Sequence, residues 1–328
     1  MSTFKEIRGT LIKSVSSDPA NPELGEIWYN NTIGVLKGVV LSGAWSSAPS
    51  LTVSHYQGAG SVNGTQEASL AFGGEGSPVG GAGPVPTGTD EYNGSSWTSG
   101  GALGTGRRTL GGCGTQTAAL GYGGEPPGVG TNITEEYDGS SWTGGGVLNT
   151  SRRYFGGGAG TQTAGLAFAG YAAYPGSPVT ATEEYNGTAW TTTNPVNVSN
   201  HSRGGCGIQT AALAIGGSGA SPTATEEYDG SSWSVGGALS AGRYSTGGMG
   251  TQTSALAVSG IGTPDPTVVE NYDGSSWTSF ASLGVGQQGG KANGSLTSAI
   301  VYAGGPPSSL LGSQEFNYAG TTQTLTTS

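Results

Sequence analysis

Few side chains in this sequence could perform chemistry. Its only histidines, His55 and His201, are three copies of an internal repeat apart. A zinc or copper site needs three or four ligands at close range, so two such histidines without acids placed uniquely beside them predict neither a metal nor another cofactor. The cysteines, Cys113 and Cys206, hold the same position in the second and fourth copies. A whole copy between them should separate their Cα atoms by more than the roughly 7 Å of a disulfide, so we interpret both as packing residues.

Three acids fall outside the repeated pattern: Glu75, Glu125 and Asp265. A pair of carboxylates is the machinery of glycoside cleavage. An active site, however, needs unlike residues that converge, and these break a repeat. The strand that would line an axis here consists almost entirely of Gly, Ala, Thr and Gln. We therefore expect no enzymatic activity, and a glycan-active hydrolase is the third of three functional hypotheses.

Planar and basic side chains recur where one repeat passes into the next, and again in the third loop. They suit the hydroxyl and carboxylate groups of sugars, because Arg forms paired hydrogen bonds and Tyr combines a ring with a hydroxyl. The candidate ligand-binding residues are Arg107, Arg152, His201, Tyr171, Tyr174, His55 and Tyr56. In the alternative interpretation each arginine pairs with a neighbouring Glu-Glu, which would explain the recurrence of Arg108, Arg153, Arg203 and Arg243.

The charge is low and unevenly spread. Charged residues make up 10% of the 328, and the net charge is −10. Residues 1–37 carry four bases and four acids, so the remainder holds the whole excess of acids. This distribution disfavours nucleic-acid binding, which needs clustered Lys and Arg. No apolar run approaches the ~18 residues of a membrane span, and the N-terminus lacks the apolar core of a signal peptide.

The elements that must position these residues come from a segment spelled six times. The fullest copies carry Gly-Gly, a small residue and Gly, then a Leu-x-aromatic pair, and Glu-Glu-Tyr-Asp-Gly-Ser-Ser-Trp. Other copies vary single positions, as in the pairs Leu213/Ile215 and Leu256/Val258. The marker glycines are Gly64, Gly114, Gly160, Gly207, Gly250 and Gly294, so the copies are 43 to 50 residues long. Such a period indicates a solenoid, a propeller or an array.

One copy reads as four strands. Residues 107–116 form a Gly-rich strand near an axis, and residues 117–124 alternate large and small side chains. Asp138-Gly139 predicts a tight hairpin turn, and Trp142 opens the fourth strand. The sequence therefore predicts an all-β fold, a six-bladed β-propeller of four-stranded antiparallel blades over residues 39–328.

Ring closure depends on the two ends of this region. The sixth copy keeps Glu315-Phe316-Asn317-Tyr318 as its third strand, but no Trp follows. A spare Trp45 stands upstream of the first copy. We expect the strand around Trp45 to pair with the C-terminal blade and tie the ring shut.

The two faces of such a ring should differ. In a four-stranded meander the 2–3 and 4–1 connections leave on one face, and the 1–2 and 3–4 turns leave on the other. The second face should be monotonous, with Gly-Thr-Gln-Thr and Asp-Gly-Ser-Ser repeated around it. The first carries varied loops at 75–89, 125–134, 171–182, 218–225, 261–268 and 306–313. Loops on a rigid scaffold usually carry recognition, so we expect binding there.

The order of residues within a copy resembles the kelch repeat: an Arg before the first strand, Gly-Gly after the second, Tyr-Asp in the third and Trp opening the fourth. The extra Gly-Thr-Gln-Thr turn resembles the Gly- and Thr-rich kelch-like proteins of tailed bacteriophage virions. Residues 16–30, Ser-Ser-Asp-Pro-Ala-Asn-Pro-Glu-Leu-Gly-Glu-Ile-Trp-Tyr-Asn, resemble a lead-in of phage tail-fibre and related structural proteins.

This resemblance implies a virion protein that is made in the host cytoplasm. Residues 1–38 would attach it to other virion proteins, and the propeller would bind a host-surface glycan or protein. The candidate attachment residues are Ile7, Leu11, Ile12, Ile27, Trp28 and Tyr29. In the second hypothesis the propeller only braces or decorates the particle. We expect no nucleic-acid partner and no membrane insertion, and the sequence leaves homo-oligomerisation open.

Overall fold

The computed structural model describes residues 12–20, 26–76, 86–126, 130–155, 157–172, 176–307 and 310–324. Of the candidate residues, Ile7, Leu11 and Tyr174 lie outside this part of the chain. The regular elements found in the described ranges are β-strands. None of the described residues belongs to a helix long and apolar enough to cross a membrane.

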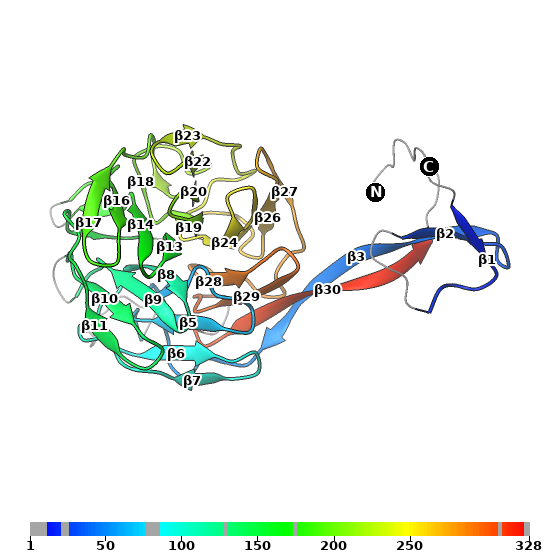
Figure 1. The fold of residues 1–328 in the computed structure, drawn as a ribbon, viewed down its shortest axis with the longest axis horizontal. Helices are drawn as coiled ribbons and strands as arrows, with labels where there is room; N and C mark the ends of the chain where they lie inside the picture. The colour runs from blue at the N-terminus through cyan, green and yellow to red at the C-terminus, as the bar shows by residue number, and fades with distance from the viewer. Residues whose placement is uncertain are drawn as a thin grey trace. The chain divides into compact units, whose positions relative to one another are not determined.

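Five sheets have four antiparallel strands each and follow one another along the chain (Figure 1). Blade 1 contains β4 (Ala59–Gly60), β5 (Ser69–Phe72), β6 (Thr89–Tyr92) and β7 (Trp97–Ser99). Blade 2 contains β8 (Gly111–Thr115), β9 (Ala118–Tyr122), β10 (Thr134–Tyr137) and β11 (Trp142–Gly144). Blade 3 contains β13 (Ala159–Thr161), β14 (Ala164–Phe168), β16 (Thr182–Tyr185) and β17 (Trp190–Thr193).

The later blades repeat this order. Blade 4 contains β19 (Gly204–Ile208), β20 (Ala211–Ile215), β22 (Thr225–Tyr228) and β23 (Trp233–Val235). Blade 5 contains β24 (Gly247–Thr251), β25 (Ser254–Val258), β26 (Val269–Tyr272) and β27 (Trp277–Ser279). Blade 6 combines β28 (Lys291–Gly294) and β29 (Ser298–Tyr302) with β30 (Ser313–Thr324) and β3 (Val35–Ala48), in the order β3-β30-β29-β28.

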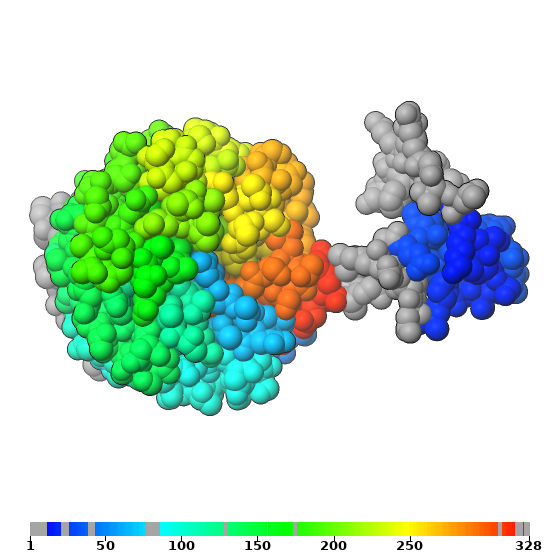
Figure 2. Space-filling view, in the orientation of Figure 1, coloured from blue at the N-terminus to red at the C-terminus, as the bar shows by residue number. Residues whose placement is uncertain are grey.

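The blades close into a ring. Each innermost strand contacts the next, from β4 through β8, β13, β19 and β24 to β28, and β28 contacts β4. In the space-filling view the blades follow one another as sectors of colour from cyan to orange (Figure 2). This arrangement is a six-bladed β-propeller, as the repeat predicts.

Glycine is required where the innermost strands crowd the axis. A Cβ on Gly248 would lie 2.7 Å from the carbonyl oxygen of Gly205, and one on Gly112 would lie 2.7 Å from Cζ of Phe72. The remaining space at the axis is a cavity of about 20 Å³. Most of the residues that line it are glycines, and Lys291 also lines it. Burial lowers the pKa of the Lys291 ammonium to about 8.

The core lies between blades, where the large face of one packs on the small face of the next. Phe72 of blade 1 lies against Gly121 of blade 2, and Leu120 of blade 2 lies against Gly165 of blade 3. The Trp142 ring, whose centroid is 4.7 Å from that of Phe72, covers the contact. This confirms the large-into-small stacking expected from the alternation. Glycine fits because even a methyl group would meet the neighbouring side chain at about 2.9 Å.

Blade 6 joins chain segments from opposite ends of the sequence. Trp45 on β3 is buried, donates a hydrogen bond from Nε1 to the carbonyl of Ala281 at 2.9 Å, and lies 5.4 Å from Phe316 between ring centroids. The amide of Leu51 donates to the carbonyl of Leu311 at 2.9 Å. The strand around Trp45 therefore supplies the outermost strand of the last blade.

The chain divides into two compact units, Trp45–Phe316 and Met1–Ala44 together with Asn317–Ser328. This differs from the predicted boundary between residues 38 and 39, and from the assignment of the last residues to the propeller. The reason is strand length. β3 and β30 contain 14 and 12 residues, whereas the other blade strands contain two to five, so both continue past the blade.

The described part of the smaller unit has its own polar centre. β1 (Lys13–Val15) pairs in parallel with β2 (Ile27–Asn30), which pairs antiparallel with β3. Asp18 accepts hydrogen bonds from Trp28 Nε1 at 3.1 Å and Asn30 Nδ2 at 2.8 Å, and its carboxylate lies 2.5 Å from Lys37 Nζ. The hydrogen bond from Lys37 contributes most to lowering the pKa of Asp18 to about 2.

The structure corrects one predicted attachment residue. Trp28 is completely buried because its indole packs inside the unit and bonds Asp18, so it presents no surface to a partner. Ile12 and Tyr29 are 40% and 41% exposed, and Ile27 is half-buried. Ile12 and Tyr29 are thus the predicted attachment residues that the structure places at the surface.

Candidate binding face

The face carrying the 2–3 and 4–1 connections, here called the loop face, is built from two successive positions in each blade. Both lie just before the innermost strand, in front of a residue whose backbone has positive φ, such as Thr109 (53°) or Ser245 (51°). The first position points into the blade and holds His55, Arg107, Arg152, Asn200, Arg243 and Gln287. The second holds Tyr56, Arg108, Arg153, His201, Tyr244 and Gln288.

The first position is structural. Arg107 and Arg152 are completely buried and pair with Glu135 and Glu183 on the third strands of their own blades, the second pair at 2.8 Å. His55, also completely buried, lies 3.5 Å from Asp90. The prediction that these three residues bind a ligand is therefore wrong. A buried guanidinium needs a facing carboxylate, and the first Glu of Glu-Glu-Tyr supplies it.

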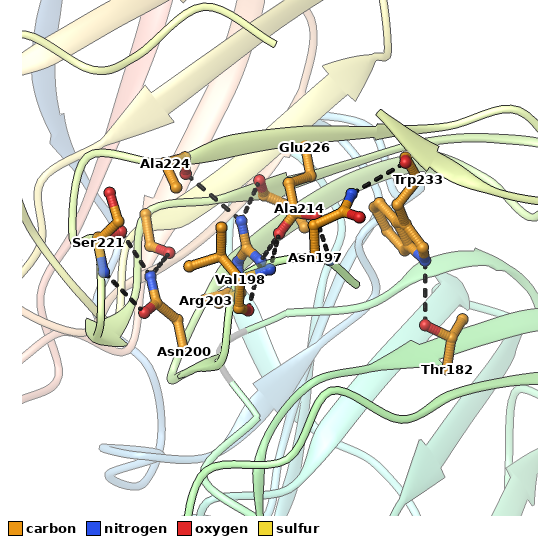
Figure 3. Close-up of polar contacts among 11 residues, drawn as sticks. Thr182, Asn197, Val198, Asn200, Arg203, Ala214, Ser221, Ala224, Glu226 and Trp233 are labelled. Atoms are coloured by element: carbon orange, nitrogen blue, oxygen red, sulfur yellow. Dashed lines mark hydrogen bonds and ion pairs between the residues drawn. The ribbon is translucent and has the colours of Figure 1, made fainter. Parts of the chain in front are cut away.

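Blade 4 reaches the same arrangement from a different backbone position (Figure 3). Asn200 occupies the place of Arg107, and its side chain bonds the carbonyls of Gly216 and Ser221 at 3.0 and 2.6 Å. Arg203, three residues later, extends its guanidinium to Glu226 at 2.5 Å and to the carbonyl of Ala214 at 3.1 Å. Arg203 and Arg243 each pair with a glutamate of the third strand, as the alternative interpretation of the recurring arginines predicts.

The second Glu of each motif joins neighbouring blades. The Tyr137 hydroxyl donates to Glu91 of the preceding blade, and Tyr228 donates to Glu184 at 2.7 Å. Burial first, and then this hydrogen bond, raise the pKa of Tyr137 to about 12. Both acids of the motif are therefore used by the scaffold.

The second position forms a half-buried ring around the loop face. Each residue is bridged to the start of the 2–3 loop in its own blade: Tyr56 to Glu75, Arg108 to Glu125, Arg153 to Tyr171, His201 to Ser218, Tyr244 to Ile261 and Gln288 to Gly305. We call these six second-position residues the inner ring. The same backbone position in the six blades therefore carries different side chains, namely Tyr, Arg, His and Gln.

Two arginines of the inner ring belong to a chain of ion pairs across blades 1 to 3. Arg108 lies 2.9 Å from Glu75 and 3.7 Å from Glu125, and Arg153 lies 2.7 Å from Glu125. The Arg108 side chain is 29% exposed. Glu75 and Glu125, weighed above as a hydrolytic pair, thus face arginines. The third acid, Asp265, accepts hydrogen bonds from Thr267 within its own loop.

An aromatic cluster continues from Arg153 into blade 4. The guanidinium of Arg153 lies over the rings of Tyr154 and Tyr171, 5.0 and 5.7 Å from their centroids. Tyr171 packs edge-on against His201 at 5.1 Å, and Tyr154 lies 5.7 Å from His201. We call Arg153, Tyr154, Tyr171 and His201 the loop-face cluster; all four are half-buried. Burial lowers the pKa of His201, which favours its neutral form near pH 7.

The structure brings Tyr171 and His201 together on the loop face, whereas Arg107, Arg152 and His55 are buried inside their blades. Tyr56 of blade 1 lies next to Gly305 of blade 6 and is not part of this cluster. Sequence reasoning missed Tyr154 as a binding candidate. Its signal was a departure from the repeat, because Thr109, Ser202 and Ser245 hold the equivalent place in blades 2, 4 and 5.

Among the residues that the structure describes, no group of three His, Cys, Asp or Glu side chains is arranged to hold an ion. Burial raises the pKa of the Cys113 and Cys206 thiols to about 12. Both cysteines are free, as expected from their places in separate blades.

Comparison with known proteins found similarity in fold but not in sequence. No protein-family model matches the sequence, and no curated protein matches it either. Among solved structures, that entitled "Structure of YjhT" superposes with a TM-score of 0.65 at 11% sequence identity, over 84% of this chain and 99% of the other. A likeness at this identity shows a shared β-propeller fold.

Proposed function

We propose that this protein is a structural component of a tailed-phage virion whose propeller binds a host-surface glycan through the loop-face cluster. The phage assignment is supported by the Gly- and Thr-rich repeat and by the lead-in at residues 16–30. The binding assignment is carried by one observation: three aromatic rings and a guanidinium from blades 3 and 4 meet on the varied face.

The chemistry of the cluster favours neutral, hydroxyl-bearing sugars. Tyr rings offer flat apolar faces with a hydroxyl at the edge, and guanidinium groups donate several hydrogen bonds in one plane. Arg153 of the cluster already pairs with Glu125, and Arg108 in blade 2 pairs with Glu75, so the local charge is balanced. An anionic sugar would therefore gain little from Arg153, whereas sugar hydroxyls would use its remaining donors.

The rigidity of the site also favours recognition. Each residue of the inner ring is fixed by a backbone bridge to its own blade. A ligand would therefore not have to order the backbone at these positions, a cost that usually subtracts from affinity. Weak binding at one site would be compensated by many copies on a particle.

The test is a glycan array probed with the protein displayed multivalently. Tyr171→Ala and His201→Ala should each reduce binding at least tenfold, because each removes a ring of the cluster. Tyr244→Ala is the matched control, since it removes an inner-ring aromatic from blade 5, outside the cluster. Folded Tyr171→Ala protein that binds as well as the original would contradict the site.

A purely structural role is the second candidate. It is favoured because most polar residues of the repeat make contacts that stabilise the fold. The first-position arginines pair with the first Glu of the motif inside their own blades, and the second Glu accepts a hydrogen bond from a tyrosine of the next blade. If cluster variants change particle stability but not adsorption to host cells, this role replaces the adhesin. The absence of glycan binding combined with lost adsorption would point to a protein receptor.

Attachment to the particle is proposed for the N-terminal unit through exposed Ile12 and Tyr29. Changing both to Ser should lower incorporation of the protein into particles while leaving the propeller folded. Normal incorporation of this variant would show that attachment uses other residues.

A further inference from the structure

The face opposite the loop face, formed by the 1–2 turns, is less uniform than the repeated Gly-Thr-Gln-Thr motif suggests. Three copies spell Gly-Thr-Gln-Thr, beginning at Gly114, Gly160 and Gly250. Blade 4 replaces the first Thr with Ile208, and blade 6 replaces the Gln with Leu296. Blade 1 adds Val62 and Asn63 before its turn. The turn glycines of blades 2 to 6 keep positive φ, from 94° at Gly114 to 114° at Gly294, so these five turns share a backbone conformation and differ in their side chains.

These departures meet at one place. Val62, Asn63, Ile208 and Leu296 all line a hollow of about 470 Å³ at the 1–2 turns of blades 1, 4, 5 and 6. Ile208 is 52% exposed. The apolar residues Val62, Ile208, Ala211 and Leu296 share the lining with exposed hydroxyl groups such as those of Thr251 and Ser254. Departures from the repeat in three blades therefore contribute to a single site.

The lining is held in place by the ring. Val62 packs on the buried core that contains Cys206, Leu213 and Ala255. Asn63 donates from Nδ2 to the carbonyl of Gly160 in blade 3 at 3.0 Å, and its amide donates to Gly114 in blade 2 at 3.0 Å. The two inserted residues thus bridge several blades, and the hollow is present without a ligand to form it.

We propose that this hollow binds a small uncharged molecule with an apolar body and a hydrogen-bonding edge. None of the described residues that line it is charged. A charged ligand would lose hydration there without gaining a partner. Its volume lies within the roughly 300–1,000 Å³ of small-molecule sites, which combine apolar walls with a few polar groups. This site is separate from the loop-face cluster and does not depend on the glycan proposal.

The test is an NMR titration of the full-length protein with labelled Ile, Leu and Val methyl groups. Three probes share one ring system and differ in charge: indole, indole-3-acetate and tryptamine. Indole should shift the methyl signals of Val62, Ile208 and Leu296 in a saturable way. The anion and the cation should bind at least tenfold more weakly.

The repeat provides matched variants. Ile208→Thr combined with Leu296→Gln restores the residues found in other blades, so this variant should fold and lose the indole shift at Val62. Thr115→Ile places the same side chain as Ile208 in blade 2 and should leave the shift at Val62 unchanged. Equal binding of the three probes, an unchanged shift in the double variant, or no saturable shift at millimolar indole would overturn the proposal.

Discussion

Arg203 and Glu226 form in blade 4 the buried ion pair that Arg107 and Glu135 form in blade 2, although the two arginines start from different backbone positions. The guanidinium of Arg203 is nearly inaccessible and lies 2.5 Å from the carboxylate. Asn200 fills the place that Arg107 holds in its own blade. The chemical requirement is therefore the pair itself, and the chain satisfies it by two routes.

Removing the guanidinium from blade 4 should be costly. Arg203→Met would leave Glu226 buried beside the amides of Asn197 and Val198 but without a counter-charge. Breaking one half of a buried ion pair typically costs about 3–5 kcal/mol. We expect a loss of this size in the free energy of unfolding, measured by urea denaturation at pH 7.

The same site offers a rescue. Asn200→Arg combined with Arg203→Leu transfers the arginine to the position used in blade 2, where Leu110 holds the place of Arg203. This variant should recover most of the stability lost in Arg203→Met. Equal destabilisation of both variants would mean that Arg203 acts through its packing, and not through the ion pair.

A missing bridge between blades 5 and 6 should be repairable. Gln116, Gln162, Gln209 and Gln252 each donate from Nε2 to the carbonyl of the preceding blade's third-strand Tyr, at 2.6 to 2.8 Å. Leu296 holds this place in blade 6 and has no donor. A net hydrogen bond contributes about 1 kcal/mol, so Leu296→Gln should raise the melting temperature by about 2–4 °C.

Calorimetry would measure this change, with Gln162→Leu as the converse variant, expected to lower the melting temperature by a similar amount. A fall in melting temperature for Leu296→Gln would show that Leu296 contributes more by apolar contact than a glutamine bridge can return.

Alkaline pH should loosen the contacts between blades. The pKa values of Tyr137, Tyr185, Tyr228 and Tyr272 are raised to about 12, mainly by burial and in addition by the facing glutamate. An unfolded Tyr titrates near pH 10. Protonated Tyr is thus favoured in the folded state, and its contribution is complete below pH 10 and is lost as the pH rises from about 10 to 12.

Urea midpoints measured from pH 8 to 11.5 would follow this loss. Phe316 shows that the fold accepts Phe at the equivalent place in blade 6. A variant with all four tyrosines changed to Phe should be less stable at pH 8 but should show a flatter dependence above pH 10. A slope equal to that of the original protein would assign the effect to other groups.

Ring closure predicts a sensitive strand at the start of the propeller. Trp45→Ala would remove the contacts with Phe316 and the hydrogen bond to Ala281. Truncation of a buried aromatic residue costs about 3–5 kcal/mol, and deletion of residues 40–50 should lower the melting temperature further. A small effect of the deletion would show that blade 6 is stable with three strands.

The repeat made most of the fold predictable. The alternation around Leu120 and the Asp138-Gly139 turn report local geometry that six copies repeat, so an error in one copy is corrected by the others. The boundary near residue 38 was not predictable in this way. It depends on how far β3 and β30 extend past the blade, and neither strand has a repeated counterpart of that length.

The site was harder to predict because adjacent residues have opposite roles. Arg107 and Arg108 are equally basic in the sequence, yet the first is buried on Glu135 and the second is partly exposed. Successive side chains of extended backbone point to opposite sides, and Arg108 is bridged to Glu125 in such a segment. Thr109, which follows, has positive φ, where Thr is unusual. The hollow near Leu296 was missed for another reason: its lining comes from four blades, so no single copy reveals it.

The shared last blade also sets an order of events during synthesis. The strand of Trp45 leaves the ribosome well before its partners Ala281 and Phe316, which are more than two hundred residues behind it. Blades 1 to 5 can form as their own residues emerge, because each uses contiguous chain. Trp45 must wait until Ala281 and Phe316 have emerged. Contacts so distant in sequence fold slowly, so the unclosed ring is the state most exposed to aggregation.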